Sequence, residues 1–268
     1  MYEKAMGCLS DKLLNFIDHT RVRDVNYDIA FEMVRNYQRL PDMSISEIAE
    51  MCFVSTSTIS RFCKFLGYQN FTEFKEHLGV SFYIKTDYSK SLTAYLGKDK
   101  EVAHDIFKNE IINNINQMMT PENLETAEQI AEAIHGSKHI AFFGSHYNLN
   151  VGKHFQKKML MMGKYVELYT DWDEQYESAV KLNGDSLALV LSVECSYLSR
   201  YASIWSAIVD SGAEIALITQ NVNSTFSSIP DLVMQCGVTN RDNSGKYGAL
   251  LAVDMLIMTY YAKYCLEK

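Results

Sequence analysis

Residues 45–67 hold two short amphipathic segments joined by a tight turn, and this pattern constrains the fold more than any other in the chain. In the first segment, Ile48, Ala49 and Cys52 recur at three- and four-residue spacing, which indicates a helix with one apolar face. Ser46 is the expected N-cap, because its hydroxyl can accept hydrogen bonds from free N–H groups of the first turn. The small side chain of Ala49 lets a second helix approach closely. The segment therefore predicts the first of two packed helices.

The second helix of the pair is expected to follow the N-cap Ser55 and to end at Gly67, a residue suited to the left-handed position after a helix. Ile59, Phe62 and Leu66 form its inward face. The outward face has no acid, and its short hydroxyls followed by two cations suit a DNA major groove. We therefore predict a helix-turn-helix, with an ordinary helix pair of a bundle as the alternative. The predicted DNA-binding residues are Ser55, Thr56, Ser57, Ser60, Arg61 and Lys64.

Several positions in and after this pair share one pattern: Ile48-Ala49-Glu50, Arg61-Phe62-Cys63, Leu66-Gly67, Phe71 and Glu73-Phe74-Lys75. This pattern resembles the RpiR family of bacterial transcriptional regulators. The resemblance implies a DNA-binding domain with a double-stranded DNA operator as its partner. One position departs from the family, since Phe53 stands where the turn usually has glycine, and a bulky residue seldom takes a left-handed conformation. We therefore expect this turn to be built differently.

The composition is that of a folded protein large enough for two domains, with 268 residues, 47% of them hydrophobic, and 3 prolines. The six cysteines include no C-x-x-C pair, so we expect reduced thiols of a cytosolic protein rather than zinc ligands or disulfides. The N-terminal stretch lacks the pattern of a signal peptide. The most apolar helix, residues 248–261, contains Asp254 and is too short to span a bilayer. We expect a soluble, cytoplasmic protein with no membrane partner.

The net charge of −8 is unusual for a DNA-binding protein. Residues 1–85 hold ten Lys and Arg against eleven Asp and Glu, so the predicted DNA-binding domain is not basic as a whole. Its acids lie mainly on the earlier helices, and local charge dominates within a Debye length of about 8 Å. We expect modest non-specific DNA affinity that depends on dimerisation.

The chain divides into two domains on the pattern of its apolar residues. Helical spacing at 9–18, 27–38 and 71–83 adds three helices to the pair and gives an N-terminal domain over residues 1–84. Apolar periodicity weakens over residues 85–100, which predicts a linker. Residues 101–268 form the second domain, which is expected to begin with helices at 101–118 and 121–134.

The second domain then alternates short apolar strands with helices. Its expected strands are 139–144, 165–169, 186–193, 214–219 and 232–236, and its further helices are 149–162, 173–182, 199–211 and 245–264. Strands that are apolar on both faces indicate a parallel sheet covered by helices on both sides, that is, an α/β three-layer αβα sandwich. Their order resembles the SIS (sugar isomerase) domain, which follows the helix-turn-helix in RpiR regulators.

A ligand of such a sheet is expected at the carboxyl ends of its strands, where helix N-termini offer N–H groups to an anion. The loops at this edge are residues 144–150, 192–198 and 219–225. The effector-binding candidates are Ser145, Asn148, Ser192, Glu194, Ser196 and Tyr197.

Two of these loops depart from the phosphosugar-binding pattern that the SIS resemblance implies. In the first, His146 replaces a glycine and Asn148 a serine, whereas in the second Glu194 replaces a hydroxyl, Cys195 a glycine and Tyr197 a threonine. Because a carboxylate repels phosphate, we expect simple sugar phosphates to bind poorly. Two alternatives remain for the pocket: it is vestigial and the domain only dimerises, or Glu194 receives a cationic or amino-bearing effector.

We therefore predict a transcriptional regulator, with genes of carbohydrate metabolism as its targets, that is a homodimer or homotetramer and senses a small metabolite. The rival is a sugar-phosphate isomerase with a helical extension. We expect no catalytic residues, no metal and no cofactor, since no motif for them is present. The closing helix is expected to contribute to the dimer through Leu250, Leu251, Met255, Leu256 and Met258.

Overall fold

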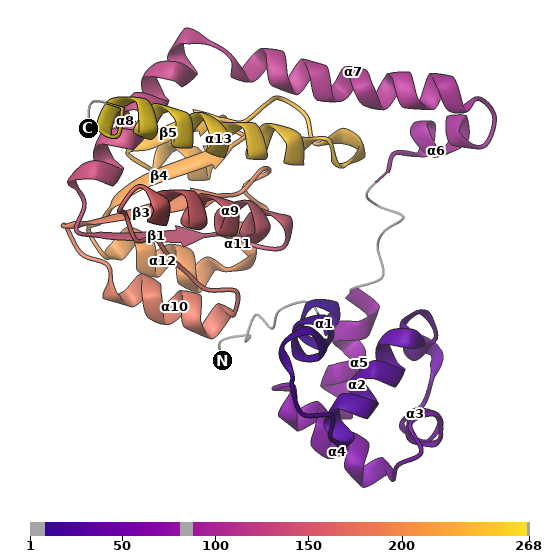
Figure 1. Ribbon diagram of the computed structural model, residues 1–268. Coiled ribbons are helices and arrows are strands. Elements are labelled where there is room, and N and C mark those ends of the chain that lie inside the picture. Colours follow the sequence, from indigo (N-terminus) through magenta and orange to yellow (C-terminus); the bar gives the residue numbers. More distant parts are fainter. Residues whose placement is uncertain (1–8, 81–87, 267–268) are drawn as a thin grey trace. The chain divides into compact units, whose positions relative to one another are not determined.

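The computed structural model describes residues 9–80 and 88–266, and its contacts divide the chain into two compact units, residues 1–86 and 87–268 (Figure 1). Among the described residues, no helix is both long and apolar enough to cross a membrane. Each unit has its own hydrophobic core.

The first unit is all helical. It contains α1 (Leu9–His19), α2 (Val25–Arg35), the 3-10 helix η1 (Tyr37–Asp42), α3 (Ile45–Met51), α4 (Thr56–Phe65) and α5 (Phe71–Val80). The five expected helices are present, although α2 ends earlier than expected and continues as a 3-10 helix around Pro41. The expected end of the last helix, residues 81–83, lies outside the described residues. The core of this unit includes Leu13, Ile29, Met33, Ile48, Ile59, Phe62 and Phe74, all fully buried.

The second unit is built on one parallel sheet, as predicted. Its strands are β1 (His139–Phe143), β2 (Glu167–Leu168), β3 (Ser186–Leu191), β4 (Glu214–Thr219) and β5 (Leu232–Gln235), in the order β2-β1-β3-β4-β5. All four pairings are parallel, and every residue of the central strand β3 is buried. The sheet therefore needs helices on both of its faces.

Helices cover both faces of the sheet and complete the predicted three-layer sandwich (Figure 1). The helices of this unit are α6 (Lys90–Leu96), α7 (Lys100–Met118), α8 (Pro121–Gly136), α9 (Tyr147–Met161), α10 (Trp172–Lys181), α11 (Ser196–Arg200), α12 (Ala202–Asp210) and α13 (Gly245–Tyr264). On one face, α13 packs against α7, α8 and α9, and on the other α10 packs against α12. The helix expected at residues 199–211 is divided at Tyr201 into α11 and α12.

The expected linker over residues 85–100 is wrong for part of its length, because α6 lies within it. Ser89 caps this helix by accepting a hydrogen bond from the N–H of Leu92 at 3.1 Å. Leu92 is 3% exposed, and α6 packs against α7. A single well-buried apolar side chain among Lys, Ser and Thr is too weak a periodic signal to reveal a helix whose burial depends on a neighbour.

Loop 237–244, which joins β5 to α13, is held by Asn114 of α7, whose side chain is fully buried. Its Oδ1 accepts the N–H groups of Val238 at 3.0 Å and Thr239 at 3.1 Å. Its Nδ2 donates to the carbonyl oxygen of Thr239 at 2.8 Å. Asn114 thus supplies partners for backbone groups of Val238 and Thr239, which belong to neither a strand nor a helix.

We expect Asn114→Ala to lower the free energy of unfolding by about 2–4 kcal/mol, because it leaves several buried backbone groups without a partner. Asn113→Ala, at the adjacent exposed position of α7, is the matched control and is expected to have little effect. Denaturant unfolding of both variants makes the comparison. Equal stability of the two variants would contradict the role of Asn114.

Candidate nucleic-acid interface and effector site

The N-cap of helix α3 lies two residues earlier than expected, at Ser44 rather than Ser46. Ser44 Oγ accepts the N–H of Glu47 at 3.3 Å, and Glu47 Oε2 accepts the N–H of Ser44 at 2.7 Å, which forms a capping box. These hydrogen bonds lower the pKa of the Glu47 carboxyl below its ordinary value. Ser46 lies inside the helix instead of capping it. The apolar face formed by Ile48 and Ala49 is buried as expected.

The turn between α3 and α4 keeps the left-handed residue that a glycine would normally supply. Phe53 has φ 55°, so the expectation that this turn is built differently is wrong. Its N–H donates to the Glu50 carbonyl at 3.1 Å, and the N–H of Val54 donates to the Ala49 carbonyl at 2.9 Å. This pair of bonds is a Schellman motif, which requires a left-handed residue after the helix. The Phe53 side chain is 94% exposed.

Helix α4 has the caps that the sequence indicates. Ser55 Oγ accepts the N–H of Thr58 at 3.2 Å, and Gly67 has φ 92°. Its inward residues Ile59 and Phe62 are fully buried. The predicted outward residues that are exposed are Thr56, Ser57, Arg61 and Lys64, whereas Ser60 is half-buried and its hydroxyl donates to the Thr56 carbonyl at 3.1 Å.

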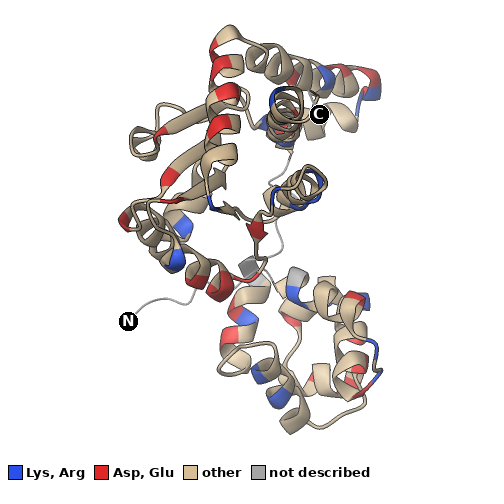
Figure 2. Cartoon of the chain, turned by 60° about the vertical axis from the view of Figure 1, so that its left-hand side comes forward, with Lys and Arg blue, Asp and Glu red and all other residues tan. Residues whose placement is uncertain are grey.

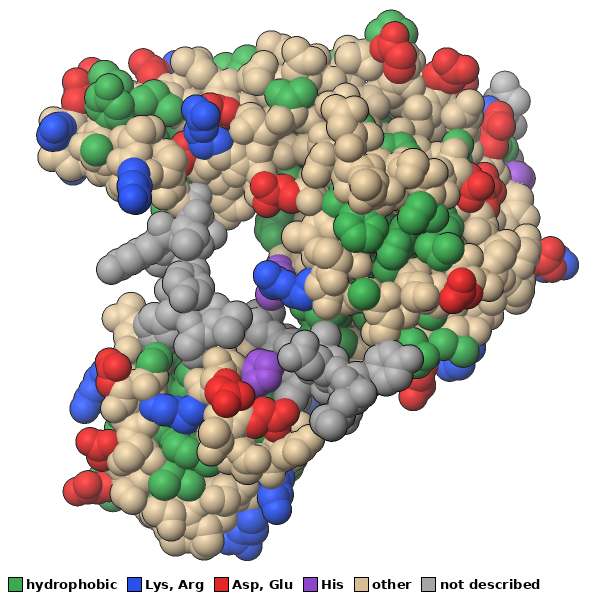
Figure 3. Space-filling model, turned by 180° about the vertical axis from the view of Figure 1, so that it is seen from behind, with side chains coloured by type: hydrophobic (Ala, Val, Ile, Leu, Met, Phe, Trp, Pro, Cys, Tyr) green, Lys and Arg blue, Asp and Glu red, His purple; other side chains and the backbone are tan. Residues whose placement is uncertain are grey.

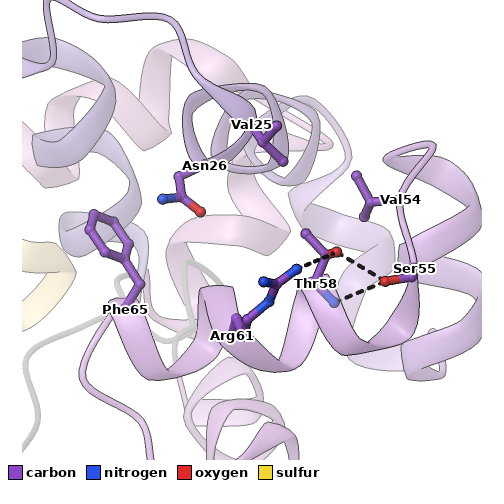
Figure 4. Close-up of a pocket in the computed structure, with 7 residues that line it drawn as sticks. All are labelled: Val25, Asn26, Val54, Ser55, Thr58, Arg61 and Phe65. Carbon is purple, nitrogen blue, oxygen red and sulfur yellow. Dashed lines mark hydrogen bonds between the residues drawn. The ribbon is translucent and has the colours of Figure 1, made fainter.

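A groove of about 520 Å³ lies beside α4 (Figure 4). Its wall combines the N-terminal end of α2, the turn after α3 and one side of α4; the lining residues are Val25, Asn26, Val54, Ser55, Thr58, Arg61 and Phe65. The Arg61 guanidinium donates to Thr58 Oγ1 at 3.3 Å, along its own helix. Arg61 therefore stands at the boundary between the groove and the outward face.

The charge of the first unit is mixed, as its composition implies. Figure 2 shows that acidic and basic residues are interspersed along the chain in both units. On α4 itself the charged residues are Arg61 and Lys64, both exposed, and neither Asp nor Glu occurs in the helix. Helix α4 thus has a net positive charge, although the first unit as a whole is not basic.

The second set of candidates lies in loops at the carboxyl edge of the sheet. Glu194 is exposed, and its Oε2 accepts a hydrogen bond from Asn240 Nδ2 at 3.0 Å. Asn240 also accepts the N–H of Gly245, the first residue of α13, at 3.1 Å. Ser145 and Asn148 are half-buried at the start of α9, and Ser196 is exposed at the start of α11. The amide of Asn240 therefore connects the loop after β3 to the N-terminus of α13.

Two of the predicted effector contacts point into the protein. Tyr197 is 1% exposed, and its hydroxyl donates to Gln175 Oε1 at 2.6 Å. Burial raises the pKa of the Tyr197 phenol well above its ordinary value. Ser192 is also buried, and its Oγ accepts the N–H of Tyr197 at 3.2 Å. The ring of Tyr197 packs in the interior beneath the loop, and its hydroxyl provides a hydrogen bond to the buried side chain of Gln175. Neither side chain is therefore available to an effector at the surface.

The two loops also retain left-handed backbone at positions where the phosphosugar pattern has glycine. His146 has φ 51° and Cys195 has φ 59°. Asp242 and Asn243, in loop 237–244, both have φ 57°. These four residues and Phe53 make up the non-glycine residues of positive φ in the described part of the chain, and such strain is typical of functional sites.

Comparison with known proteins identifies the first unit. The profile described as "Helix-turn-helix domain, rpiR family" matches residues 27–83, from α2 to the segment that follows α5. An uncharacterized HTH-type transcriptional regulator of Haemophilus influenzae is 22% identical over 212 residues, which cover 78% of this chain and 73% of that protein. Residues 27–83 are an RpiR-type helix-turn-helix domain, and the chain is a helix-turn-helix transcriptional regulator.

Solved structures extend the similarity to the second unit. The NanR protein of Vibrio vulnificus aligns with a TM-score of 0.53 over 94% of this regulator and 92% of that chain, at 18% identity. The sugar isomerase domain of an RpiR transcription factor from Sphaerobacter thermophilus aligns with a TM-score of 0.50 over 60% of this chain and 89% of that one, at 20% identity. The sheet unit of the regulator therefore has a SIS-like fold.

Sequence reasoning missed three polar residues of the regulator's sheet edge. Asn240 binds Glu194, as described above, and Asp242 is 4% exposed with its Oδ1 bound to the N–H of Ser89 at 2.5 Å. Among the described residues, Asp242 Oδ2 and Gln220 Oε1 are buried without a hydrogen-bond partner. All three lie in loops that carry no motif, so only their burial distinguishes them from surface polar residues.

Proposed function

We propose that the regulator binds its operator through the outward face of α4, with Arg61 as the principal contact. The observation that carries this proposal is the exposed, acid-free face beside a capped helix N-terminus. Ser55, Thr56, Ser57 and Ser60 supply hydroxyls for base edges or backbone, and Lys64 supplies a charge for phosphate. DNA of a bacterium lies in the cytoplasm, where we expect the protein to act.

Arg61→Ala is expected to weaken specific binding to the DNA upstream of the regulator's own gene by about 5- to 150-fold per contact, because a good bidentate base contact is worth about 1–3 kcal/mol. Folding should be unaffected, since the side chain is exposed. Lys64→Ala is the matched variant and is expected to weaken binding to all sequences and reduce the salt dependence by about one unit of slope. Electrophoretic shifts at several salt concentrations distinguish the two; if Arg61→Ala changes only the salt slope, Arg61 contacts phosphate instead.

We infer that the SIS-like unit senses a small metabolite at the carboxyl edge of its sheet. The V. vulnificus NanR structure, similar in fold, contains ManNAc-6P. In this chain, loop 237–244 joins the candidate site to the start of the unit: Asn240 holds Glu194, and Asp242 holds Ser89, the cap of α6. A ligand that displaces Glu194 from Asn240 would disturb the loop that anchors α6. In the sequence, α6 begins at Lys90, shortly after the division between the two units at residues 86 and 87. This connection supports a route from effector to DNA-binding domain.

The chemistry of the loop after β3 argues against a simple sugar phosphate as the effector. Two like charges about 4 Å apart repel by roughly 4 kcal/mol at an effective dielectric of 20, and by less at an exposed site. The helix N-terminus and the hydroxyl of Ser196 offset part of this repulsion. An amino-bearing ligand would instead gain from Glu194, and a vestigial pocket in a domain that only oligomerises is the alternative.

We expect calorimetric titration of the native regulator with ManNAc-6P and a panel of hexose and pentose phosphates to show no low-micromolar binding. Replacing Glu194, Cys195 and Tyr197 together by Ser, Gly and Thr is expected to restore phosphate binding. Because Tyr197 is buried, Glu194→Ser with Cys195→Gly serves as a second variant that leaves the interior intact. Low-micromolar binding of any of these phosphates by the native protein would contradict our interpretation of the loop.

We propose that the regulator is a homodimer or homotetramer and that its interface includes α9 and α13. The two helices pack together, and His154 on α9 lies 2.9 Å from Asp254 on α13. Met161 and Tyr261 each lie two turns further along their own helix. The exposed apolar residues on these parts of the two helices are Leu160 (62%), Met161 (72%), Met258 (59%) and Tyr261 (49%).

Hydrophobic side chains also reach the surface of the sheet unit on the face shown in Figure 3. The helix residues expected at the interface are only partly available, since Met255 and Leu256 are buried against the sheet whereas Met258 is exposed. The interface that we propose therefore differs from the one expected from the composition of the helix alone.

Sedimentation of the native regulator at micromolar concentration is expected to show a dimer or tetramer. Met161→Glu combined with Met258→Glu should dissociate it, because two buried charges without partners oppose association. Val180→Glu, at a position 58% exposed on α10, is the control on the opposite face of the sheet. A native monomer, or dissociation by the control alone, would be inconsistent with this interface.

We further propose that the chain is not an enzyme. Two similar curated proteins are named as HTH-type transcriptional regulators, although similar solved folds include a candidate sugar-phosphate isomerase. The carboxylate of Glu194, in the loop after β3, accepts a hydrogen bond from Asn240. A sugar-phosphate isomerase with a helical extension would require an acid and a base at this edge. Specific DNA binding in the shift assay separates the regulator from this alternative.

A further inference from the structure

Phe53, the left-handed residue of the helix-turn-helix, has a strained backbone that a glycine at the same position would avoid. An L-residue in this conformation brings its Cβ close to the next carbonyl oxygen, whereas glycine adopts it freely. Phe53 has φ 55° and ends α3 in a motif that glycine would satisfy equally well. A bulky aromatic side chain at this position is therefore a disadvantage for stability unless the ring makes a contact of its own.

Within the chain, the ring of Phe53 makes almost no contact, because 94% of the residue is exposed. Cys195, the corresponding strained residue in the loop after β3, differs in this respect. It is 4% exposed, and its Sγ lies 3.3 Å from Thr219 Oγ1. Packing compensates the strain at Cys195, and no comparable packing compensates the strain at Phe53.

The location of Phe53 indicates which binding partner could compensate for its backbone strain. The residue lies two positions before Ser55, the N-cap of α4, and next to Val54 of the groove wall. The adjoining surface is the N-terminal end of α4, with exposed Thr56 and Ser57 and no acid in the helix. A duplex that presents its major groove to α4 would bring a groove edge to this turn.

We propose that Phe53 is a DNA-contacting residue whose ring packs against apolar atoms at the edge of the major groove. A phenyl ring offers no hydrogen bond, so its partners on DNA are thymine methyl groups and deoxyribose carbons. The contacts of the ring with DNA then compensate, in the bound state, for the stability that the strained backbone costs the free protein. This inference rests on the proposed operator binding through α4.

The test compares folding and DNA affinity in the same variants of the full chain. Phe53→Gly and Phe53→Asn relieve the left-handed strain and are expected to keep or raise the unfolding midpoint, by up to about 4–8 °C. Both are expected to bind the upstream DNA about tenfold more weakly. Phe53→Leu keeps a large apolar side chain and should stay close to the native affinity, and Phe31→Ala, at an exposed aromatic of α2, is the control.

Operators with single thymines replaced by uracil identify the DNA partner, because uracil lacks the C5 methyl group. If the ring contacts a thymine methyl, one such replacement lowers the DNA affinity of the native protein and leaves the affinity of Phe53→Gly unchanged. If the ring contacts deoxyribose, every replacement changes the affinity of the two proteins equally. The inference is overturned if Phe53→Gly binds with native affinity, if it loses stability, or if it changes the oligomeric state without DNA. Failure of the native protein to bind specific DNA would instead refute the proposed function itself.

Discussion

The parallel direction of all five strands determines where the SIS-like unit can have a site. Because each connection returns over a face of the sheet, the loops after β1, β3, β4 and β5 emerge at one edge. The central strand β3 is buried throughout, so polar chemistry is confined to that edge. Glu194, Cys195, Asn240 and Asp242 all belong to these loops, although they lie far apart in the sequence.

The loop between β5 and α13 depends on partners from outside the sheet. Asn114 of α7 satisfies its backbone, and Ser89 at the start of α6 is bound to Asp242. The helices that precede the sheet in sequence are thus joined to the edge where we place the effector. Glu194 is connected to α6 by two hydrogen bonds, one to Asn240 and one from Ser89 to Asp242, with the backbone of residues 240–242 between them. This connection is the physical content of the proposed regulation.

Three positions where the resemblance leads one to expect glycine carry other residues, namely Phe53, His146 and Cys195, and all three keep positive φ. The backbone of each loop is therefore retained while a side chain is added to it. At Cys195 the added side chain packs inside, whereas at Phe53 it projects into solvent. The same backbone constraint thus has different consequences, which depend on what surrounds each turn.

The sequence by itself determined the helix-turn-helix, the N-cap Ser55, the end of α4 at Gly67 and the parallel sheet, because these depend on local periodicity and on caps within one turn. The Ser44 cap of α3 was also contained in the local Ser44-x-x-Glu47 pattern, although Ser46 was expected in its place. Only the tertiary structure decided that α6 forms in the expected linker and that Tyr197 faces Gln175. Each of these outcomes depends on which backbone or side-chain group finds a partner, often a distant one, and a one-dimensional pattern does not contain that information.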